Sequence, residues 1–163
     1  AQAYCRQHSP DLVDRIEQSD DDEYLFDRHN IDEHIEEAQS TRVELPSGGW
    51  VMFETTQAMT TIDVNSGNHD APARAVNLEA TQIIARQIRL RGLGGLIAID
   101  FIDMTESLDG EAVLQALDEG FTGDKQPVRI GPMSEFSVVE MTRRRGGMTL
   151  AQSLQQIRPA VDE

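Results

Sequence analysis

The chain of 163 residues has little positive charge, a single cysteine and no long apolar run. Its 14 lysine and arginine residues face 29 aspartate and glutamate residues, and this net charge of −15 argues against strong binding of nucleic acid by the chain alone. Cys5 has no partner for an internal disulfide. Because no segment is apolar over a membrane-spanning length and no charged-then-apolar leader opens the chain, we expect a soluble, cytoplasmic protein outside the membrane.

The acidic residues are concentrated in the first part of the chain. Residues 1–46 hold 13 acidic and 4 basic side chains, including the run DDDE at 20–23 and the acidic segment 32–37. Such runs are usually solvated surfaces rather than metal ligands. The four histidines show no spacing that would place two of them on one zinc site. Hydrophobic residues make up 39% of the chain, which is enough for one core.

Two short motifs carry the most informative side chains. Asp63 and Asn65 lie two residues apart in the strand-like segment 60–66, so the carboxylate and the amide point to one face. Asp100 ends the apolar run 96–99, which predicts a strand that is covered on both faces and central in its sheet. Two carboxylates and an amide on rigid strands suit a hydrated Mg²⁺ ion that grips a phosphate.

The clearest helix runs from Leu78 to a stop at Gly92, with apolar residues at three- and four-residue spacing. It leads from the segment with Asp63 to the segment with Asp100, so we expect their strands to be neighbours joined by a crossover. The other predicted elements are a helix tail at 1–8, a short strand at 12–17, a helix at 31–38, a turn at 46–49, hairpin strands at 50–54 and 59–64, a helix at 108–119, strands at 128–130 and 137–141, and a terminal helix at 150–157.

A series of motifs follows in a fixed order along the chain. They are LPSGGW at 45–50, TTIDVNS at 60–66, NLEA at 77–80, IARQIRLR at 84–91 and LGGLIAIDFIDM at 93–104. Together they resemble the catalytic core of the ribonuclease E/G family of endoribonucleases, and a weaker similarity extends from about Asp11 to Arg145. The resemblance implies an α+β fold, a mixed β-sheet with flanking helices, like the deoxyribonuclease I-like subdomain of that core.

The resemblance also implies a division of the chain. Residues 1–46 would be an acidic remnant of the preceding subdomain, with a helix, a short strand and a helix. Residues 47–147 would form the metal-binding catalytic subdomain, and residues 148–163 a C-terminal helix and tail. Because family members are much longer, we expect the chain to be a fragment or a reduced family member.

Individual roles follow from the same resemblance. In the family, the matched aspartates hold a catalytic Mg²⁺ ion and the matched asparagine orients the first of them, which assigns Asp63, Asp100 and Asn65. Mn²⁺ is expected to be able to replace Mg²⁺. The implied reaction is the hydrolysis of single-stranded RNA by an activated water, leaving 5′-phosphate products. Asp103 either supports this site from behind the metal ligands or caps the helix that follows.

Five arginines are candidates for contact with RNA. Arg86 and Arg89 share one face of the predicted helix, and Arg143, Arg144 and Arg145 form the one concentrated basic run. Both groups have an alternative interpretation. Cations near the last turn of a helix complement its dipole, and a basic run before two glycines is often an exposed linker.

The chain departs from the family pattern at several places. The Cys-x-x-Cys zinc link that follows the equivalent of Arg145 is missing, so no zinc link is expected. The loop at 66–74 is shorter than usual, and Glu135 stands where a basic residue is common. The expected partner is single-stranded RNA, and a homo-oligomer and RNA-processing protein partners remain open. The alternative function is a non-catalytic RNA- or protein-interaction module derived from the same family.

Overall fold

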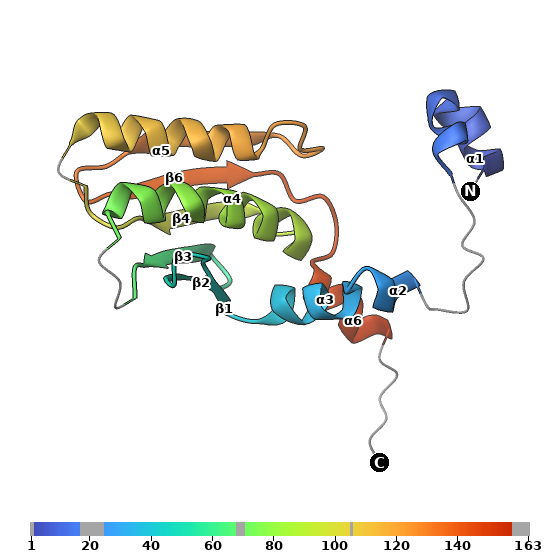
Figure 1. Cartoon of the computed structure of the whole chain (residues 1–163), viewed down its shortest axis with the longest axis horizontal. Coiled ribbons are helices and arrows are strands. Elements are labelled where there is room, and N and C mark those ends of the chain that lie inside the picture. The colour runs from blue at the N-terminus through green and yellow to red at the C-terminus, as the bar shows by residue number, and fades with distance from the viewer. Residues whose placement is uncertain (1, 17–24, 68–70, 105, 158–163) are drawn as a thin grey trace, which may run out of the picture. The chain divides into compact units, whose positions relative to one another are not determined.

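The computed structural model describes residues 2–16, 25–67, 71–104 and 106–157 (Figure 1). The chain forms two compact units, one ending at residue 35 and the other beginning at residue 36. β1 (Arg42–Glu44) pairs with the strand that follows it and belongs to the larger unit, and the division predicted at residue 46 stays a prediction. The acidic run DDDE at 20–23 lies outside the described residues.

The smaller unit contains short helices. They are α1 (Gln2–His8), the 3₁₀ helix η1 (Pro10–Arg15), α2 (Leu25–Arg28) and the first residues of α3 (Ile31–Gln39). The strand predicted at 12–17 is wrong over residues 12–16, and residue 17 lies outside the described residues. Pro10 opens a tight helical turn instead, in which the N–H of Ile16 donates to the carbonyl of Val13 at 3.3 Å. The described residues of this unit include no strand with which an extended segment could pair.

The larger unit is built on a six-stranded mixed sheet, which confirms the predicted α+β class. Its further strands are β2 (Trp50–Thr55), β3 (Met59–Asn65), β4 (Gly95–Asp100), β5 (Val128–Met133) and β6 (Val138–Arg143), in the spatial order β1-β2-β3-β4-β6-β5. Only β3 and β4 run parallel among these pairs; the rest are antiparallel. A parallel pair needs a crossover, which α4 (Ala73–Arg91) supplies as predicted.

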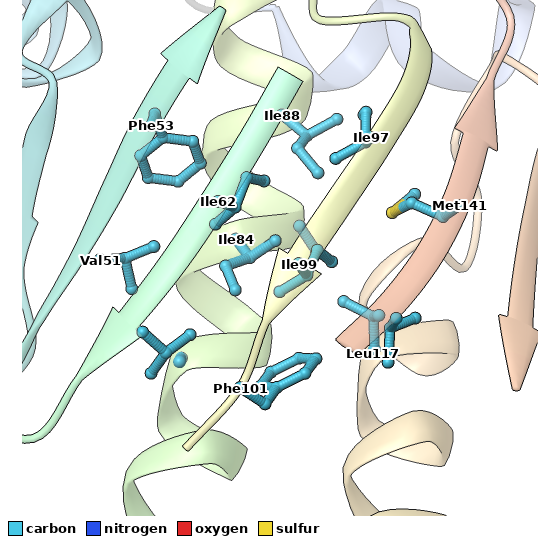
Figure 2. Packing of buried hydrophobic residues seen from close by; sticks show 14 of the residues in the cluster. Val51, Phe53, Ile62, Ile84, Ile88, Ile97, Ile99, Phe101, Leu117 and Met141 are labelled. Atoms are coloured by element: carbon cyan, nitrogen blue, oxygen red, sulfur yellow. The ribbon is translucent and has the colours of Figure 1, made fainter. Parts of the chain in front are cut away.

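Helices α4 and α5 (Ser107–Gly120) pack against each other and cover one face of the sheet (Figure 1). Alternation along the strands sends every second side chain into this core. Figure 2 shows Val51, Phe53, Ile62, Ile84, Ile88, Ile97, Ile99, Phe101, Leu117 and Met141 packed there. Gly92 adopts φ +66° and ends α4 where the sequence predicts, because this left-handed conformation suits glycine.

The opposite face of the sheet carries no helix among the described elements of the larger unit, and this corrects the expectation for β4. Its position between β3 and β6 is central, as predicted. Ile97 and Ile99 are fully buried, yet Leu96 is 38% exposed and Asp100 is exposed. The apolar run 96–99 therefore reflects burial of one face only. The terminal helix α6 (Leu150–Ile157) matches its prediction.

Among the described residues, no helix combines the length and apolarity required to cross a bilayer.

Candidate active site

Asp63 and Asp100 lie directly beside each other on the open face of the sheet. They are register partners on the parallel strands β3 and β4. Their chain neighbours Ile62 and Ile99 are buried under the helices, so the pleat turns both carboxylates toward the solvent side. Because hydrogen-bonded strands are about 4.8 Å apart, the backbone alone brings the two carboxylates close together.

An open depression of about 670 Å³ surrounds this pair. Besides Asp63 and Asp100, its polar lining includes Asn65, Asp103 and Glu135. No arginine or lysine belongs to the lining among the described residues. The site therefore gathers four carboxylates without a cation from the described part of the chain.

Asn65 holds Asp63 in place. Its amide Nδ2 donates a hydrogen bond of 2.7 Å to Oδ2 of Asp63. This geometry requires both side chains on one face of β3, as the sequence predicts. A neutral donor fixes the orientation of the carboxylate and leaves its negative charge in place for a cation.

The electrostatics of Asp100 reflect this accumulation of negative charge. Partial burial, followed by repulsion from Asp63 and Asp103, raises the pKa of the Asp100 carboxyl. The folded state therefore binds this proton more tightly than the unfolded state does, and ionisation of Asp100 as the pH rises costs folding stability. None of the ion pairs in the described residues neutralises these three aspartates.

The donor set fits Mg²⁺ or Mn²⁺. Carboxylate and amide oxygens are ligands that Mg²⁺ prefers, and this ion usually keeps several waters and takes one or two carboxylates from the protein. Within the described ranges, no group of three or more His, Cys, Asp or Glu side chains could hold a metal ion on its own. Asp63 and Asp100 alone would leave most positions around an ion to water and substrate.

Asn77, which sequence reasoning did not single out as a site residue, holds the segment after Asp100. Its side chain is fully buried on α4. It donates to the carbonyl of Ile102 at 2.8 Å and accepts from the N–H of Ile102 at 3.1 Å. The segment that carries Asp103 is thereby fixed beside Asp100. The sequence did contain a signal for this role, because Asn77 is a polar residue at a helical position that faces the core.

Replacing Asn77 by Ala is expected to lower the free energy of unfolding by about 2 kcal/mol, because two partly buried backbone groups of Ile102 lose their partners. It is also expected to weaken metal binding, because Asp103 and Asp100 lose their fixed spacing. Urea denaturation and a Mg²⁺ titration measure the two effects.

Thr81→Ala is the matched control. Thr81 is equally buried on α4, but its hydroxyl donates to the carbonyl of Leu78 within the same helix. This variant should lose stability and keep its metal affinity. Equal metal affinity in both variants would show that Asn77 serves the core alone.

The turn at 46–49 supports the end of the strand that carries Asp63 and Asn65. Gly49 packs so closely against the carbonyl of Asn65 that any side chain would collide with it. The carboxylate of Glu79 on α4 accepts the N–H of Ser47 at 3.2 Å. Turn, helix and strand therefore hold this end of the sheet in one arrangement.

Comparison with known proteins matches this arrangement to one family. Residues 1–146 match the model of the ribonuclease E/G family. This chain belongs to the ribonuclease E/G family. It is 38% identical to "Ribonuclease G" of Salmonella typhimurium over 148 residues, which covers 87% of this chain and 30% of the relative. It is 39% identical to "Ribonuclease E" of Escherichia coli over 166 residues, which covers 95% of this chain and 16% of the relative. The chain thus spans less than a third of these relatives.

The five candidate arginines of this ribonuclease E/G family chain lie away from the carboxylates. Gly95, at the start of β4, pairs with Arg143, whereas Asp100, at its end, pairs with Val138. Five strand steps of about 3.3 Å separate these positions, roughly 16 Å in total. Arg86 and Arg89 lie exposed on α4, which covers the other face of the sheet. The structure therefore does not bring the arginines together with Asp63 and Asp100.

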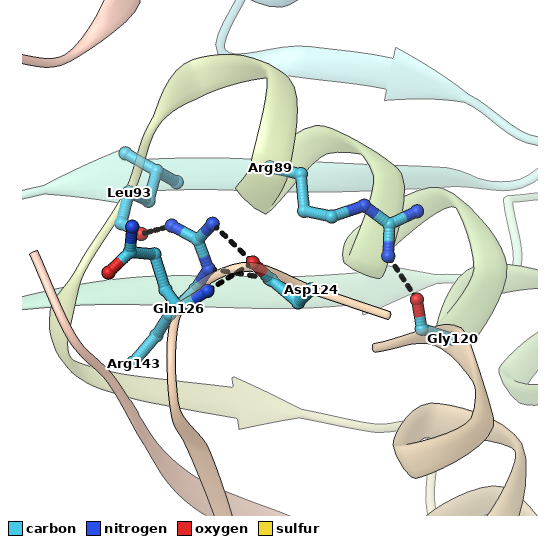
Figure 3. A network of polar contacts seen from close by, with 6 residues as sticks. All are labelled: Arg89, Leu93, Gly120, Asp124, Gln126 and Arg143. Carbon is cyan, nitrogen blue, oxygen red and sulfur yellow. Dashed lines mark hydrogen bonds and ion pairs between the residues drawn. The ribbon is translucent and has the colours of Figure 1, made fainter. Parts of the chain in front are cut away.

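Arg143 has a structural role. It is only 8% exposed, and its guanidinium bonds the Asp124 carboxylate at 2.8 and 3.0 Å and the Leu93 carbonyl at 2.8 Å (Figure 3). The hydrogen bonds from Arg143 are the main reason why the pKa of the Asp124 carboxyl lies below its usual range. The guanidinium of Arg143 is therefore engaged inside the protein and is not exposed for contact with RNA.

The remaining arginines keep exposed side chains. Arg89 donates to the carbonyl of Gly120 (Figure 3), and Arg145 donates to the carbonyl of Gly94 at 3.3 Å. Arg86 and Arg144 are exposed as well. Contact of these four with RNA stays a prediction, at a place remote from Asp63 and Asp100.

Proposed function

We propose that this chain carries the metal-binding centre of an endoribonuclease that hydrolyses single-stranded RNA and leaves 5′-phosphate products. One observation supports this most directly: two in-register carboxylates, Asp63 and Asp100, share an open depression without a neutralising cation from the described part of the chain. The named relatives are ribonucleases, which supports the same reaction class. The proposal includes action in the cytoplasm, and assembly with further copies or RNA-processing proteins stays open.

The residues of the site have distinct tasks in this proposal. Asp63 and Asp100 would supply the carboxylate ligands of Mg²⁺, with Mn²⁺ as a substitute. When bound, the ion would polarise the scissile phosphate and favour deprotonation of the attacking water. Asn65 keeps Asp63 in its ligating orientation by the 2.7 Å hydrogen bond. Asp103 adds negative charge beside Asp100, which strengthens attraction for a divalent cation.

A thermal-shift measurement tests the metal site directly. A Mg²⁺ or Mn²⁺ concentration tenfold above Kd adds about 1.4 kcal/mol to stability, which is expected to raise Tm by about 3–6 °C for a chain of this size. Asp63→Asn should abolish the shift. Glu140→Gln should keep it, because Glu140 is an exposed carboxylate on the same sheet face outside the depression. A shift that persists in Asp63→Asn would locate the metal elsewhere.

A non-catalytic interaction module is the second candidate. The net charge of −15 and the distance between the arginines and the carboxylates favour it, since both weaken the attraction of this chain for RNA. Absence of any metal-induced shift in the unmodified chain would support the module over the nuclease.

A further inference from the structure

Phe136 stands beside the carboxylates with most of its ring in solvent. It is 72% exposed and lines the same depression as Asp63 and Asp100. Single exposed apolar side chains are common on protein surfaces and need no explanation by themselves. Phe136 differs from such side chains because hydrogen bonds fix the turn that carries it beside the carboxylates.

The turn that presents Phe136 is fixed by its own hydrogen bonds. The hydroxyl of Ser134 accepts the N–H groups of Phe136 and Val138 at 3.2 Å each. The N–H of Ser137 donates to the Ser134 carbonyl at 3.1 Å. Ser137 adopts φ +58°, a left-handed conformation that is unfavourable for a residue with a side chain. Such conformations persist where the surrounding contacts enforce them, often at functional sites.

The same turn is bonded to the strand that ends at Asp100. The N–H of Phe101 donates to the Ser137 carbonyl at 3.1 Å, and Val138 is the register partner of Asp100. Backbone hydrogen bonds therefore set the distance between the Phe136 turn and the Asp100 carboxylate. The backbone that carries the ring is therefore fixed beside the depression.

The negative charge of the depression limits the kinds of interaction by which it could bind RNA. Its described lining has four carboxylates and no arginine or lysine, so neutralisation of phosphates by these side chains cannot supply affinity for the strand. Stacking of a base on an aromatic ring needs no charge and accepts any base. Two aromatic side chains belong to the described lining, and of these Phe101 is buried whereas Phe136 exposes its ring.

We propose that Phe136 is a stacking platform that binds the nucleobase of the nucleotide next to the scissile phosphate. This inference rests on the proposed nuclease function. Glu135 and Ser137, on either side of Phe136, also line a second depression of about 470 Å³ whose apolar lining includes Met104 and Met133. Residues of this turn thus line both depressions, and in this proposal an RNA strand that leaves the carboxylates would pass over the Phe136 ring.

Equilibrium binding tests the platform. The probe is a fluorescein-labelled single-stranded RNA hexamer at low salt with Ca²⁺, verified as intact afterwards, and the readout is fluorescence anisotropy. Phe136→Ala is expected to weaken binding about fivefold or more, and Phe136→Leu likewise because it lacks a ring. Phe136→Tyr should bind as the unmodified chain does. Leu108→Ala, which removes a side chain of similar exposure (70%) outside the depression, should also leave binding unchanged.

Hexamers with one abasic ribose identify the contact as stacking. At one position the missing base should weaken binding to the unmodified chain and leave binding to Phe136→Ala unaltered, because the ring and the base are partners in one contact. Equal losses in both chains, or equal affinity of Phe136→Ala and the unmodified chain, would overturn the platform. Failure of the unmodified chain to bind at millimolar hexamer would overturn it as well.

Cleavage in Mg²⁺, measured in parallel, separates this inference from the function on which it rests. Cleavage of RNA at an unchanged rate by Phe136→Ala would remove the platform and leave the nuclease. Base-dependent binding through Phe136 without any cleavage would leave the platform and support the interaction module.

Discussion

Replacement of Asp100 by Asn is expected to slow Mg²⁺-dependent cleavage of single-stranded RNA by about a thousandfold or more. A metal ion that polarises a phosphoryl oxygen contributes several kcal/mol to the transition state, and each 1.36 kcal/mol is a factor of ten in rate. Asn is isosteric but carries no charge, so it loses most of the attraction for the ion. The measurement is the initial rate of cleavage of a 5′-labelled, A/U-rich RNA with and without Mg²⁺, in a context that cleaves when unmodified.

Asp63→Asn should give a loss of the same size, because the two carboxylates lie side by side on paired strands. Asn65→Ala should reduce the rate less, since it only frees the orientation of Asp63. Glu140→Gln is again the control, and it should cut at the unmodified rate. A full cleavage rate in either aspartate variant would exclude the pair as the catalytic centre.

The largest effect on stability is expected at Asp124. Asp124→Ala should lower the free energy of unfolding by about 3–5 kcal/mol, because it leaves the Arg143 guanidinium buried without its anion. The side chains of Arg143 and Asp124 are only 8% and 4% exposed, and their ion pair measures 2.8 Å. Urea denaturation at pH 7 measures this loss.

Two further variants test the cause of that loss. The double variant Asp124→Leu with Arg143→Met removes both charges and should be clearly more stable than Asp124→Ala. Glu44→Ala breaks the exposed Arg42–Glu44 pair, whose side chains are 47% and 64% exposed, and should cost well under 1 kcal/mol. A double variant no more stable than Asp124→Ala would assign the loss to packing instead of charge.

The pH dependence has a defined sign. The pKa of Asp124 is lowered in the folded state, so its stabilising contribution is present above the usual Asp range and is lost as the pH falls through the lowered pKa. The difference between the unmodified chain and Asp124→Ala should therefore stay constant from about pH 5 to pH 8 and decrease only in strong acid.

The elements with strong periodic patterns were predictable from the sequence. The alternation around Asp63, the helix closed by Gly92 and the strand ending at Asp100 all follow from local spacing, and the structure confirms each of them. Their order along the chain was enough to predict a parallel pair joined by a crossover. The pairing of the two carboxylates followed from that topology.

Other features depend on contacts that local patterns do not contain. Arg143 belongs to a run of three arginines that looks uniformly exposed, yet its position on β6 points it inward to Asp124. The segment at 12–17 has strand-like residues but no partner strand among the described residues of its unit. The run 96–99 looks buried on both sides, although only the helices on one face cover it.

The carboxylates of Asp63 and Asp100 stand on hydrogen-bonded strand positions, so their spacing is set by the ladder between β3 and β4 and not by any loop. Insertions and deletions in the connecting segments can therefore accumulate without moving the pair. If the proposed nuclease function holds, loops grafted from longer relatives would change the surroundings of the carboxylates and leave the spacing of Asp63 and Asp100 unchanged.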